Sequence, residues 1–417
     1  MYRSLLFVFA ISPSLTNAQW SYTNAPLVDR YDDVFFIGPD TGWAAGGSEG
    51  TIIRTYDGGD TWQVVFAGPG YLRSIEFATP EVGFCGALDG RLLRTADGGD
   101  TWQDISSTIT PPQSGVCGLS APTPEVIYGV GVWSQPGNVI RSTDGGSSWT
   151  NTSLFGQATS LVDVLFLNAD TGFVSGQAMP LSAGGVILRT EDGGDTWTTV
   201  HTTGTGSDYI WKLQTPDGVH IYGSIEGPPG NGTRFTHSAD GGLTWDTDTI
   251  TMDYNYIQVI GFLDATHGWT GGSGSLLETV DGGSNWTPAF IGSAYDRFHR
   301  VNDHLAYLTG SSIYKYINGT VPVGEAAARP HPEWITVQPN PGITVTQVLA
   351  AVKVNSAAQV ELFSADGRFI RTLYAGTLSA GVHRFDMDVI GLANGGYFVT
   401  LRTNEGRTMS PLQIHRD

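Results

Sequence analysis

Cysteine, basic side chains and long apolar runs are all scarce in this chain of 417 residues. Two cysteines cannot build a disulfide framework, and Cys85 and Cys117 are equally compatible with one bridge or with two separate buried thiols. The formal charge of −19 excludes nucleic-acid binding by bulk electrostatics, because an acidic body repels phosphate. Beyond residue 18 no stretch approaches the roughly 18 apolar residues of a membrane-spanning helix, so we expect no transmembrane segment.

Glycine, in contrast, is abundant. Its 56 residues are about twice the usual share, which predicts many tight turns between short strands and therefore an all-β fold. Hydrophobic residues make up 40% of the chain and aromatic residues 11%, so a sizeable core can be buried. The acidity is uneven, because residues 19–328 hold 12 basic and 33 acidic side chains while residues 329–417 are nearly neutral. Such a step in composition indicates a domain boundary.

The first 18 residues have the features of a secretory signal peptide. Arg3 provides the positive charge, residues 5–11 form a short apolar run, and Ala18 is the small residue that signal peptidase accepts before Gln19. We therefore expect an exported protein whose mature chain begins at Gln19.

One motif of six residues recurs six times and predicts the architecture. It runs from an Asp through two Gly to a Trp, and successive copies are 40, 47, 48, 48 and 41 residues apart. These intervals are typical of one four-stranded propeller blade per repeat. The Asp and Trp residues of the motif are Asp57 and Trp62, Asp97 and Trp102, Asp144 and Trp149, Asp192 and Trp197, Asp240 and Trp245, and Asp281 and Trp286.

The motif has the chemistry of a hairpin turn. Its carboxylate can accept hydrogen bonds from its own turn, its glycines allow positive φ, and its Trp begins the next strand and buries its ring. Calcium needs oxygen ligands at alternating loop positions, and here the second and third positions are Gly, so we predict no metal and no cofactor.

A second periodic feature counts the blades independently. Seven aromatic residues stand in short strands at blade spacing: Trp43, Phe84, Tyr128, Phe173, Tyr222, Trp269 and Tyr307. The seventh blade, over residues 296–317, lacks the motif and a Trp-led outer strand, and residues 19–22 at the mature N-terminus supply such a strand. Pairing the two would leave no exposed edge. We therefore predict a seven-bladed β-propeller over residues 19–320, closed by its N-terminal strand.

The six motifs resemble the Asp-box of the BNR-repeat propellers, a group that includes sialidases, two-propeller xyloglucanases, sortilin-type receptors and photosystem II assembly factors. The resemblance covers roughly residues 19–320. It implies the fold and leaves the activity open, because proteins of unrelated function share the box.

Residues 321–333 are predicted to be a linker, and residues 334–417 a small antiparallel β-sandwich with short alternating strands. A Pro-Asn-Pro sequence, an Asp-Gly-Arg turn and a Gly-Gly-Tyr-Phe-Val strand follow one another there, and Asn340, Gly367 and Tyr397 mark them. The order resembles the type A sorting domain of the type IX secretion system. The resemblance implies that the secretion machinery is a partner and that the protein reaches the cell surface or the medium. A plain accessory sandwich is the alternative.

No catalytic residue can be assigned. A sialidase-like enzyme needs three arginines around a carboxylate, and four of the ten propeller arginines occupy one repeated position, three residues before the box Asp, as scaffold elements do. Those four are Arg54, Arg94, Arg141 and Arg189. Enzymatic activity stays uncertain, and we expect none.

If the propeller binds a ligand, its innermost strands and the loops at one rim are the natural place. The residues predicted to face a ligand are Asp33, Arg73, Asp163, Tyr209, Trp211, Tyr256 and Arg297. Aromatic and acidic groups together suit a sugar, while the alternative is a channel lined by the same residues and filled with water. The sequence thus predicts a secreted or cell-surface binding or adhesion module for an extracellular glycan or protein, and its rival is a secreted glycoside hydrolase of sialidase-like or related type.

Overall fold

A computed structural model describes residues 19–132, 137–253, 256–273, 275–289, 291–318, 334–338, 345–352, 355–364, 368–379, 381–404 and 407–414. Its contacts divide the chain into two units, residues 1–319 and 320–417. The leader predicted over residues 1–18 and the linker predicted over residues 321–333 lie outside the described residues. Within the described part, no helix is long and apolar enough to cross a membrane.

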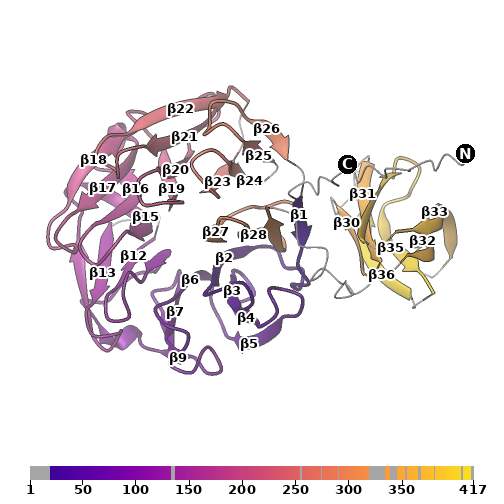
Figure 1. Cartoon of the computed structure of the whole chain (residues 1–417), viewed down its shortest axis with the longest axis horizontal. Coiled ribbons are helices and arrows are strands. Elements are labelled where there is room, and N and C mark those ends of the chain that lie inside the picture. Colours follow the sequence, from indigo (N-terminus) through magenta and orange to yellow (C-terminus); the bar gives the residue numbers. More distant parts are fainter. Residues whose placement is uncertain are drawn as a thin grey trace, which may run out of the picture. The chain divides into compact units, whose positions relative to one another are not determined.

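The described residues of the first unit form seven sheets, which Figure 1 shows side by side around a common centre. Sheet 1 contains β2 (Tyr31–Phe36), β3 (Gly42–Gly46), β4 (Thr51–Thr55) and β5 (Gln63–Ala67). Sheet 2 contains β6 (Leu72–Phe77), β7 (Gly83–Ala87), β8 (Leu92–Thr95) and β9 (Gln103–Asp104). Sheet 3 contains β11 (Gly118–Ser120), β12 (Ile127–Val130), β13 (Asn138–Ser142), β14 (Trp149–Ser153) and β10 (Ile109–Thr110).

The other four sheets follow the same plan, with β15, β19, β23 and β27 innermost in sheets 4 to 7 (Figure 1). Sheet 4 contains β15 (Ala158–Phe166), β16 (Gly172–Ala178), β17 (Gly185–Thr190) and β18 (Thr198–Thr202). Sheet 5 contains β19 (Tyr209–Gln214), β20 (Ile221–Glu226), β21 (Thr233–Ser238) and β22 (Asp246–Thr251). Sheet 6 contains β23 (Ile257–Phe262), β24 (Gly268–Gly272), β25 (Leu276–Thr279) and β26 (Thr287–Ala289). Sheet 7 contains β27 (Phe298–Asn302), β28 (Leu305–Thr309), β29 (Ile313–Ile317) and β1 (Gln19–Tyr22).

All strand pairs of these sheets are antiparallel except that of β10 with β14. Two short 3-10 helices, η1 (Ser106–Thr108) and η2 (Leu181–Ala183), lie between strands. Cys85 and Cys117 are both free and buried, so the bridge that the sequence left open does not form.

Each Asp-box closes the turn between the third and fourth strands of its sheet. In sheet 1 the backbone N–H and the hydroxyl of Thr61 donate to Asp57 at 2.7 and 2.6 Å, and Thr55 Oγ1 donates to it at 2.8 Å. Gly58 and Gly59 have φ of 66° and 94°, a conformation that favours glycine. The same hydrogen bonds lower the pKa of the box carboxylates in sheets 2 to 5 to about 2. The box carboxylates therefore accept their hydrogen bonds from groups within their own turns.

Aromatic rings join neighbouring sheets. Phe36 on the innermost strand of sheet 1 stacks on Tyr307 of sheet 7, with ring centroids 3.6 Å apart, and meets the box residue Trp62 edge-on at 6.0 Å. The arrangement recurs for Phe77 with Trp43 and Trp102, for Phe166 with Tyr128 and Trp197, and for Phe262 with Tyr222 and Trp286. All seven marker aromatics lie on second strands and are buried.

Three of the four repeated arginines, Arg54, Arg94 and Arg141, contact the box turn of the next sheet, whereas Arg189 pairs with Glu191 in its own sheet. Arg54 of sheet 1 donates to the carbonyl of Gly98 at 2.9 Å and pairs with Asp100 at 2.7 Å, both in the box of sheet 2. In sheet 7, which has no box arginine, Lys315 Nζ donates to the carbonyl of Gly58 in sheet 1 at 3.1 Å. These cations therefore act in the scaffold.

Sheet 7 contains both ends of the unit. β1 pairs antiparallel with β29, so that Trp20 lies opposite Tyr316. The Trp20 ring lies 5.2 Å from that of Trp269 in sheet 6 and 5.1 Å from that of Tyr316. The fourth strand of this sheet thus comes from the N-terminal end of the described chain.

The second unit has two antiparallel sheets around one core. The first contains β30 (Trp334–Gln338), β31 (Val345–Val352) and β34 (Gly381–Asp388). The second contains β33 (Phe369–Leu378), β32 (Ser356–Ser364), β35 (Gly395–Arg402) and β36 (Arg407–Ile414). That core contains side chains from both sheets, among them Val348, Val360, Val399 and Leu412.

The three marker residues of the second unit are only partly described. Asn340 and Gly367 lie outside the described residues. Tyr397 on β35 is buried, and its hydroxyl donates to the carbonyl of Ala393 at 2.9 Å.

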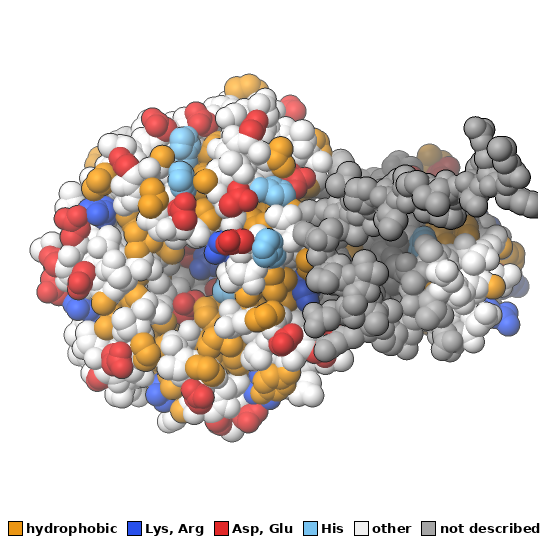
Figure 2. Space-filling model, viewed as in Figure 1, with side chains coloured by type: hydrophobic (Ala, Val, Ile, Leu, Met, Phe, Trp, Pro, Cys, Tyr) orange, Lys and Arg blue, Asp and Glu red, His pale blue; other side chains and the backbone are white. Residues whose placement is uncertain are grey.

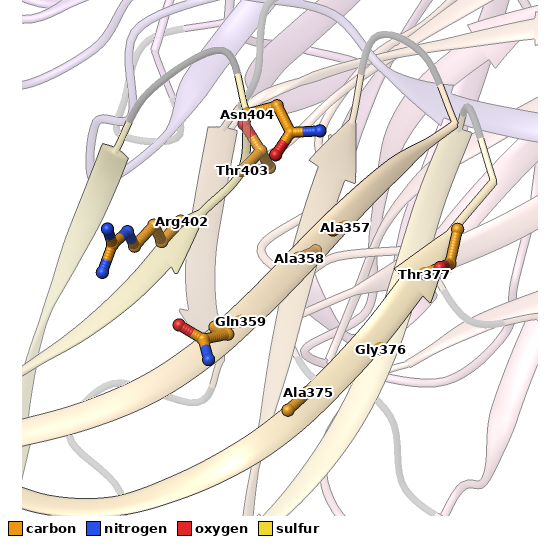
Figure 3. Close-up of a pocket in the computed structure, with 9 residues that line it drawn as sticks. All are labelled: Ala357, Ala358, Gln359, Ala375, Gly376, Thr377, Arg402, Thr403 and Asn404. Carbon is orange, nitrogen blue, oxygen red and sulfur yellow. The ribbon is translucent and has the colours of Figure 1, made fainter.

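Small side chains hollow one face of the four-stranded sheet into a cavity of about 410 Å³ (Figure 3). The residues that line the cavity are Ala357, Ala358, Gln359, Ala375, Gly376, Thr377, Arg402, Thr403 and Asn404. Arg402 is the only ionisable side chain among these nine, so the cavity offers neither an acid–base pair nor metal ligands.

Candidate binding site at the centre of the first unit

Charged side chains meet at the centre of the first unit because the innermost strands are irregular. In five of the seven described sheets this strand shifts register early, as between Tyr31 and Asp33 in β2. Such a bulge adds one residue to one strand of the pair and changes the direction in which the neighbouring side chains point. Asp32 and Asp33, although adjacent, both contact cations of other sheets: Arg73 on β6 and Arg297, which directly precedes β27. On the face seen in Figure 2, charged side chains of both signs lie in the central hollow.

Five of these residues form what we name the Arg73 cluster: Arg30, Asp32, Arg73, Lys212 and Asp296. Arg73 Nη1 lies 2.6 Å from Asp32 Oδ1 and 2.7 Å from Asp296 Oδ1. Arg30 Nη2 lies 2.6 Å from Asp32 Oδ1, and Lys212 Nζ lies 3.4 Å from Asp296 Oδ1. All but Arg30 are buried, so these charges stabilise one another instead of being solvated.

Three further residues form the Arg297 cluster: Asp33, Asp163 and Arg297. Arg297 Nη1 lies 3.0 Å from both carboxylate oxygens of Asp163, and its Nε lies 3.3 Å from Asp33 Oδ1. The backbone N–H of Ile75 donates to Asp33 at 3.0 Å, and that of Leu213 donates to Asp163 at 2.7 Å. Each carboxylate of this cluster is therefore paired and also hydrogen-bonded to a neighbouring strand.

Burial raises the pKa of the acids in this region, and the neighbouring charges decide whether that rise persists. Burial raises the pKa of Asp296, but Arg73, Lys212 and Arg30 outweigh it and lower that pKa to about 2. Burial raises the pKa of Glu76 to about 8, and the negative charge of Asp33 adds to the rise. The backbone N–H of Ala121 donates to Glu76 at 3.3 Å. At neutral pH Asp296 is therefore ionised and Glu76 is mostly protonated.

Replacing Glu76 by Gln is expected to stabilise the protein at pH 8 and to change little near pH 4.5. The folded pKa of about 8 lies above the ordinary value of 4.5, so stability is fully present below pH 4.5 and falls as the pH rises to 8. The shift corresponds to at most ~5 kcal/mol, and water reaching this partly exposed side chain reduces it to about 2 kcal/mol. Urea unfolding between pH 4.5 and 8.5 measures the difference.

The control is Glu125→Gln, which removes an exposed carboxylate. It is expected to follow the wild-type pH profile. If Glu76→Gln follows that profile too, Glu76 is ionised in the folded protein and the pKa assignment is wrong.

A different group of side chains lies in sheets 5 and 6, and we name it the Glu226 site: Tyr209, Trp211, Glu226, Tyr256 and Gln258. Tyr209 lies directly opposite Glu226 in the β19–β20 pair, and the Tyr209 and Trp211 rings stack with centroids 5.4 Å apart. Burial raises the pKa of Glu226, and the polar groups of Trp211, Tyr256 and Gln258 oppose that rise. Tyr256 is 41% exposed, so solvent reaches the site.

The structure divides the seven residues predicted to face a ligand between these groups. The buried ion-pair clusters contain Asp33, Arg73, Asp163 and Arg297, and the Glu226 site contains Tyr209, Trp211 and Tyr256. Two contacts connect the groups: the Arg73 guanidinium carbon lies 5.9 Å from the centre of the Trp211 ring, and Arg30 Nη1 donates to Gln258 Oε1 at 2.7 Å. That these seven residues face a ligand stays a prediction.

Sequence reasoning missed six members of the three groups: Arg30, Asp32, Lys212, Glu226, Gln258 and Asp296. Asp32 and Asp296 each stand one residue before a predicted residue, and the register shift at Asp32 and Asp33 leaves no mark in the sequence. Glu226 ends a second strand, where no repeat position draws attention to it. Among the described residues, no three His, Cys, Asp or Glu side chains are placed to hold a metal ion.

Residues 12–112 match the model of a family described as photosynthesis system II assembly factor YCF48. None of the curated proteins matches the chain. Among solved structures, YCF48 bound to D1 peptide is 18% identical with a TM-score of 0.57, over 74% of this chain and 99% of that one. The structural likenesses, with those below, show that the first unit has an all-β propeller fold, and the family match supports BNR-type repeats over residues 12–112.

Two bacterial structures are also similar. The GH74 xyloglucanase from Xanthomonas campestris is 12% identical with a TM-score of 0.54, over 80% of this chain and 60% of that one. PorZ of Porphyromonas gingivalis, described as an essential bacterial surface component of the type-IX secretion system, is 14% identical with a TM-score of 0.51, over 93% of this chain and 60% of that one.

Proposed function

We propose that the protein is an exported binding module, in which the seven sheets are the blades of one closed propeller and the ligand binds at the Glu226 site. One contrast carries the proposal. The four aspartates of the two ion-pair clusters are buried against cations, whereas the Glu226 site combines aromatic rings, hydrogen-bonding groups and solvent access. Aromatic side chains with a few convergent polar groups are typical of a binding site.

The second candidate is a secreted glycoside hydrolase. The structural likeness to a GH74 xyloglucanase is the observation that favours it. Glycoside hydrolysis needs an accessible acid and a second carboxylate about 5 to 9.5 Å away as nucleophile or base. Asp32, Asp33, Asp163 and Asp296 each lie within 3.4 Å of a cation and are buried, so none of the four is free to attack a sugar or to activate water. The geometry thus favours binding over hydrolysis.

A screen of the mature chain, residues 19–417, against fluorogenic glycosides and polysaccharides separates the two functions. We expect no release of fluorophore or reducing ends above background. If the protein turns over a glycoside, and Glu226→Gln abolishes this turnover while Glu125→Gln keeps it, the protein is a hydrolase and the proposed binding function is wrong.

We also propose that the second unit is a type A sorting domain of the type IX secretion system, folded as a β-sandwich. The Pro-Asn-Pro, Asp-Gly-Arg and Gly-Gly-Tyr-Phe-Val sequences support this, as do the separate hydrophobic core of the unit and the likeness to PorZ over 93% of the chain.

Deleting residues 334–417 is expected to retain the protein in the periplasm, because the proposed sorting signal is gone while the leader still directs the chain across the inner membrane. Cell fractionation and mass spectrometry of the medium measure this. Unchanged export of the shortened chain contradicts the proposal, and so does an intact chain in the medium that still ends at Asp417.

A further inference from the structure

Within the part of the chain that the structure describes, the Glu226 carboxylate has no cationic partner, unlike the aspartates around it. The four aspartates of the two clusters all pair with Arg or Lys, and nearby Asp208 pairs with Arg234 at 2.7 Å. Among the described residues no ion pair includes Glu226, and its neighbours Trp211, Tyr256 and Gln258 are all neutral. Burying part of a carboxylate costs free energy when no opposite charge lies beside it, and a bound cation would lower that cost.

The surroundings of Glu226 suit a cation. Tyr209 lies opposite it across the strand pair, Tyr256 is exposed beside it, and Trp211 stacks on Tyr209. Aromatic faces attract ammonium and guanidinium groups, and a carboxylate adds a charge-assisted hydrogen bond. The protein already uses one of these rings in this way, because the Arg73 guanidinium lies over Trp211.

A neutral ligand fits this site less well. Covering Glu226 with a neutral sugar would remove water from the carboxylate without supplying a charge to replace it. A cation supplies that charge, and the net charge of −19 attracts it from a distance. Charge complementarity therefore selects a cation over a glycan.

We propose that the Glu226 site binds a cationic group, the ammonium of a lysine or the guanidinium of an arginine, presented by an extracellular partner. This inference rests on the proposed binding function and names the ligand class of that site.

The test is isothermal titration of the mature chain with three hexapeptides, in which one Lys, one Arg or one Gln stands in an otherwise identical Gly/Ser sequence. The Nα-acetyl amides of Lys and Arg form a second arm, which distinguishes a free amino-acid cation from one that needs a peptide. We expect the Lys or Arg peptide to bind and the Gln peptide not to bind. Glu226→Gln is expected to weaken the binding about tenfold.

Matched variants separate specific from diffuse attraction. Glu125→Gln removes the same charge from an exposed position and is expected to change affinity less than about twofold. Tyr256→Phe keeps the ring face and is expected to bind, whereas Tyr256→Leu is expected to bind several-fold more weakly. Near-UV circular dichroism confirms that each variant is folded.

Three results overturn the inference: equal loss in Glu226→Gln and Glu125→Gln, equal binding of the Gln peptide, or no binding of any cationic probe. A glycan that binds in a Glu226-dependent manner also overturns the cationic ligand class, yet it leaves the binding function intact. Glycoside turnover, in contrast, removes the binding function itself, so the two failures are distinguishable.

Discussion

Replacing Arg73 by Met is expected to lower the free energy of unfolding by about 3 to 5 kcal/mol, because the change leaves Asp32 and Asp296 buried with less counter-charge. Arg73 donates to both carboxylates, and all three side chains are buried. Met keeps the apolar stem of the side chain and removes the guanidinium, so most of the loss reports on its charge and hydrogen bonds. Urea unfolding monitored by circular dichroism at pH 7 measures it.

The matched control is Arg141→Met. Arg141 pairs with Asp195 at 2.7 Å, but the side chains are 30% and 73% exposed, so we expect a change below about 1 kcal/mol. Adding Asp296→Asn to Arg73→Met is expected to recover part of the loss, because it removes one of the unpaired charges. Equal effects of Arg73→Met and Arg141→Met contradict a buried ion-pair centre.

The second large effect is expected at the N-terminal strand. Trp20→Ala should destabilise the first unit by about 3 kcal/mol, since the ring contacts Trp269, Phe298 and Tyr316 across the junction of sheets 6 and 7. The side chain is partly exposed, which places the expectation at the lower end for an aromatic truncation. Thermal unfolding of the mature chain measures the change.

Ser21→Ala on the same strand is the control. Its hydroxyl donates to the carbonyl of Lys315 at 3.3 Å and is only partly buried, so we expect a loss of about 0.5 kcal/mol. Should Trp20→Ala prove as mild as Ser21→Ala, β1 does not close the propeller and the closed-ring proposal fails.

The parts of the molecule that repeat could be predicted from the sequence. The box Asp, its glycines and the marker aromatics recur at blade spacing, and each makes contacts within its own turn or with the adjacent sheet. The fold follows from such local and nearest-neighbour contacts, which a single sequence displays by repetition. The all-β propeller fold predicted from the motifs is confirmed, and the family match over residues 12–112 supports its BNR-type repeats.

The centre could be predicted only in part, because its contacts join residues far apart in the chain. Arg297 pairs with Asp33 and Asp163, although 264 and 134 residues separate them, and no spacing rule relates such positions. The sequence placed Arg73 and Trp211 among the ligand-facing residues but could not show that Arg73 is bound to two carboxylates. Glu226 was missed because its distinction is that no ion pair among the described residues includes it, which only the packed structure displays.

The central claim is that ligand binds at the Glu226 site, and hydrogen–deuterium exchange of the mature chain with and without the Lys hexapeptide tests it most directly. The claim predicts slower exchange in the peptides that contain residues 209–211, 226 and 256–258, and unchanged exchange in the Asp-box turns. Slower exchange confined to the box turns or to residues 334–414, with none around Glu226, would contradict it.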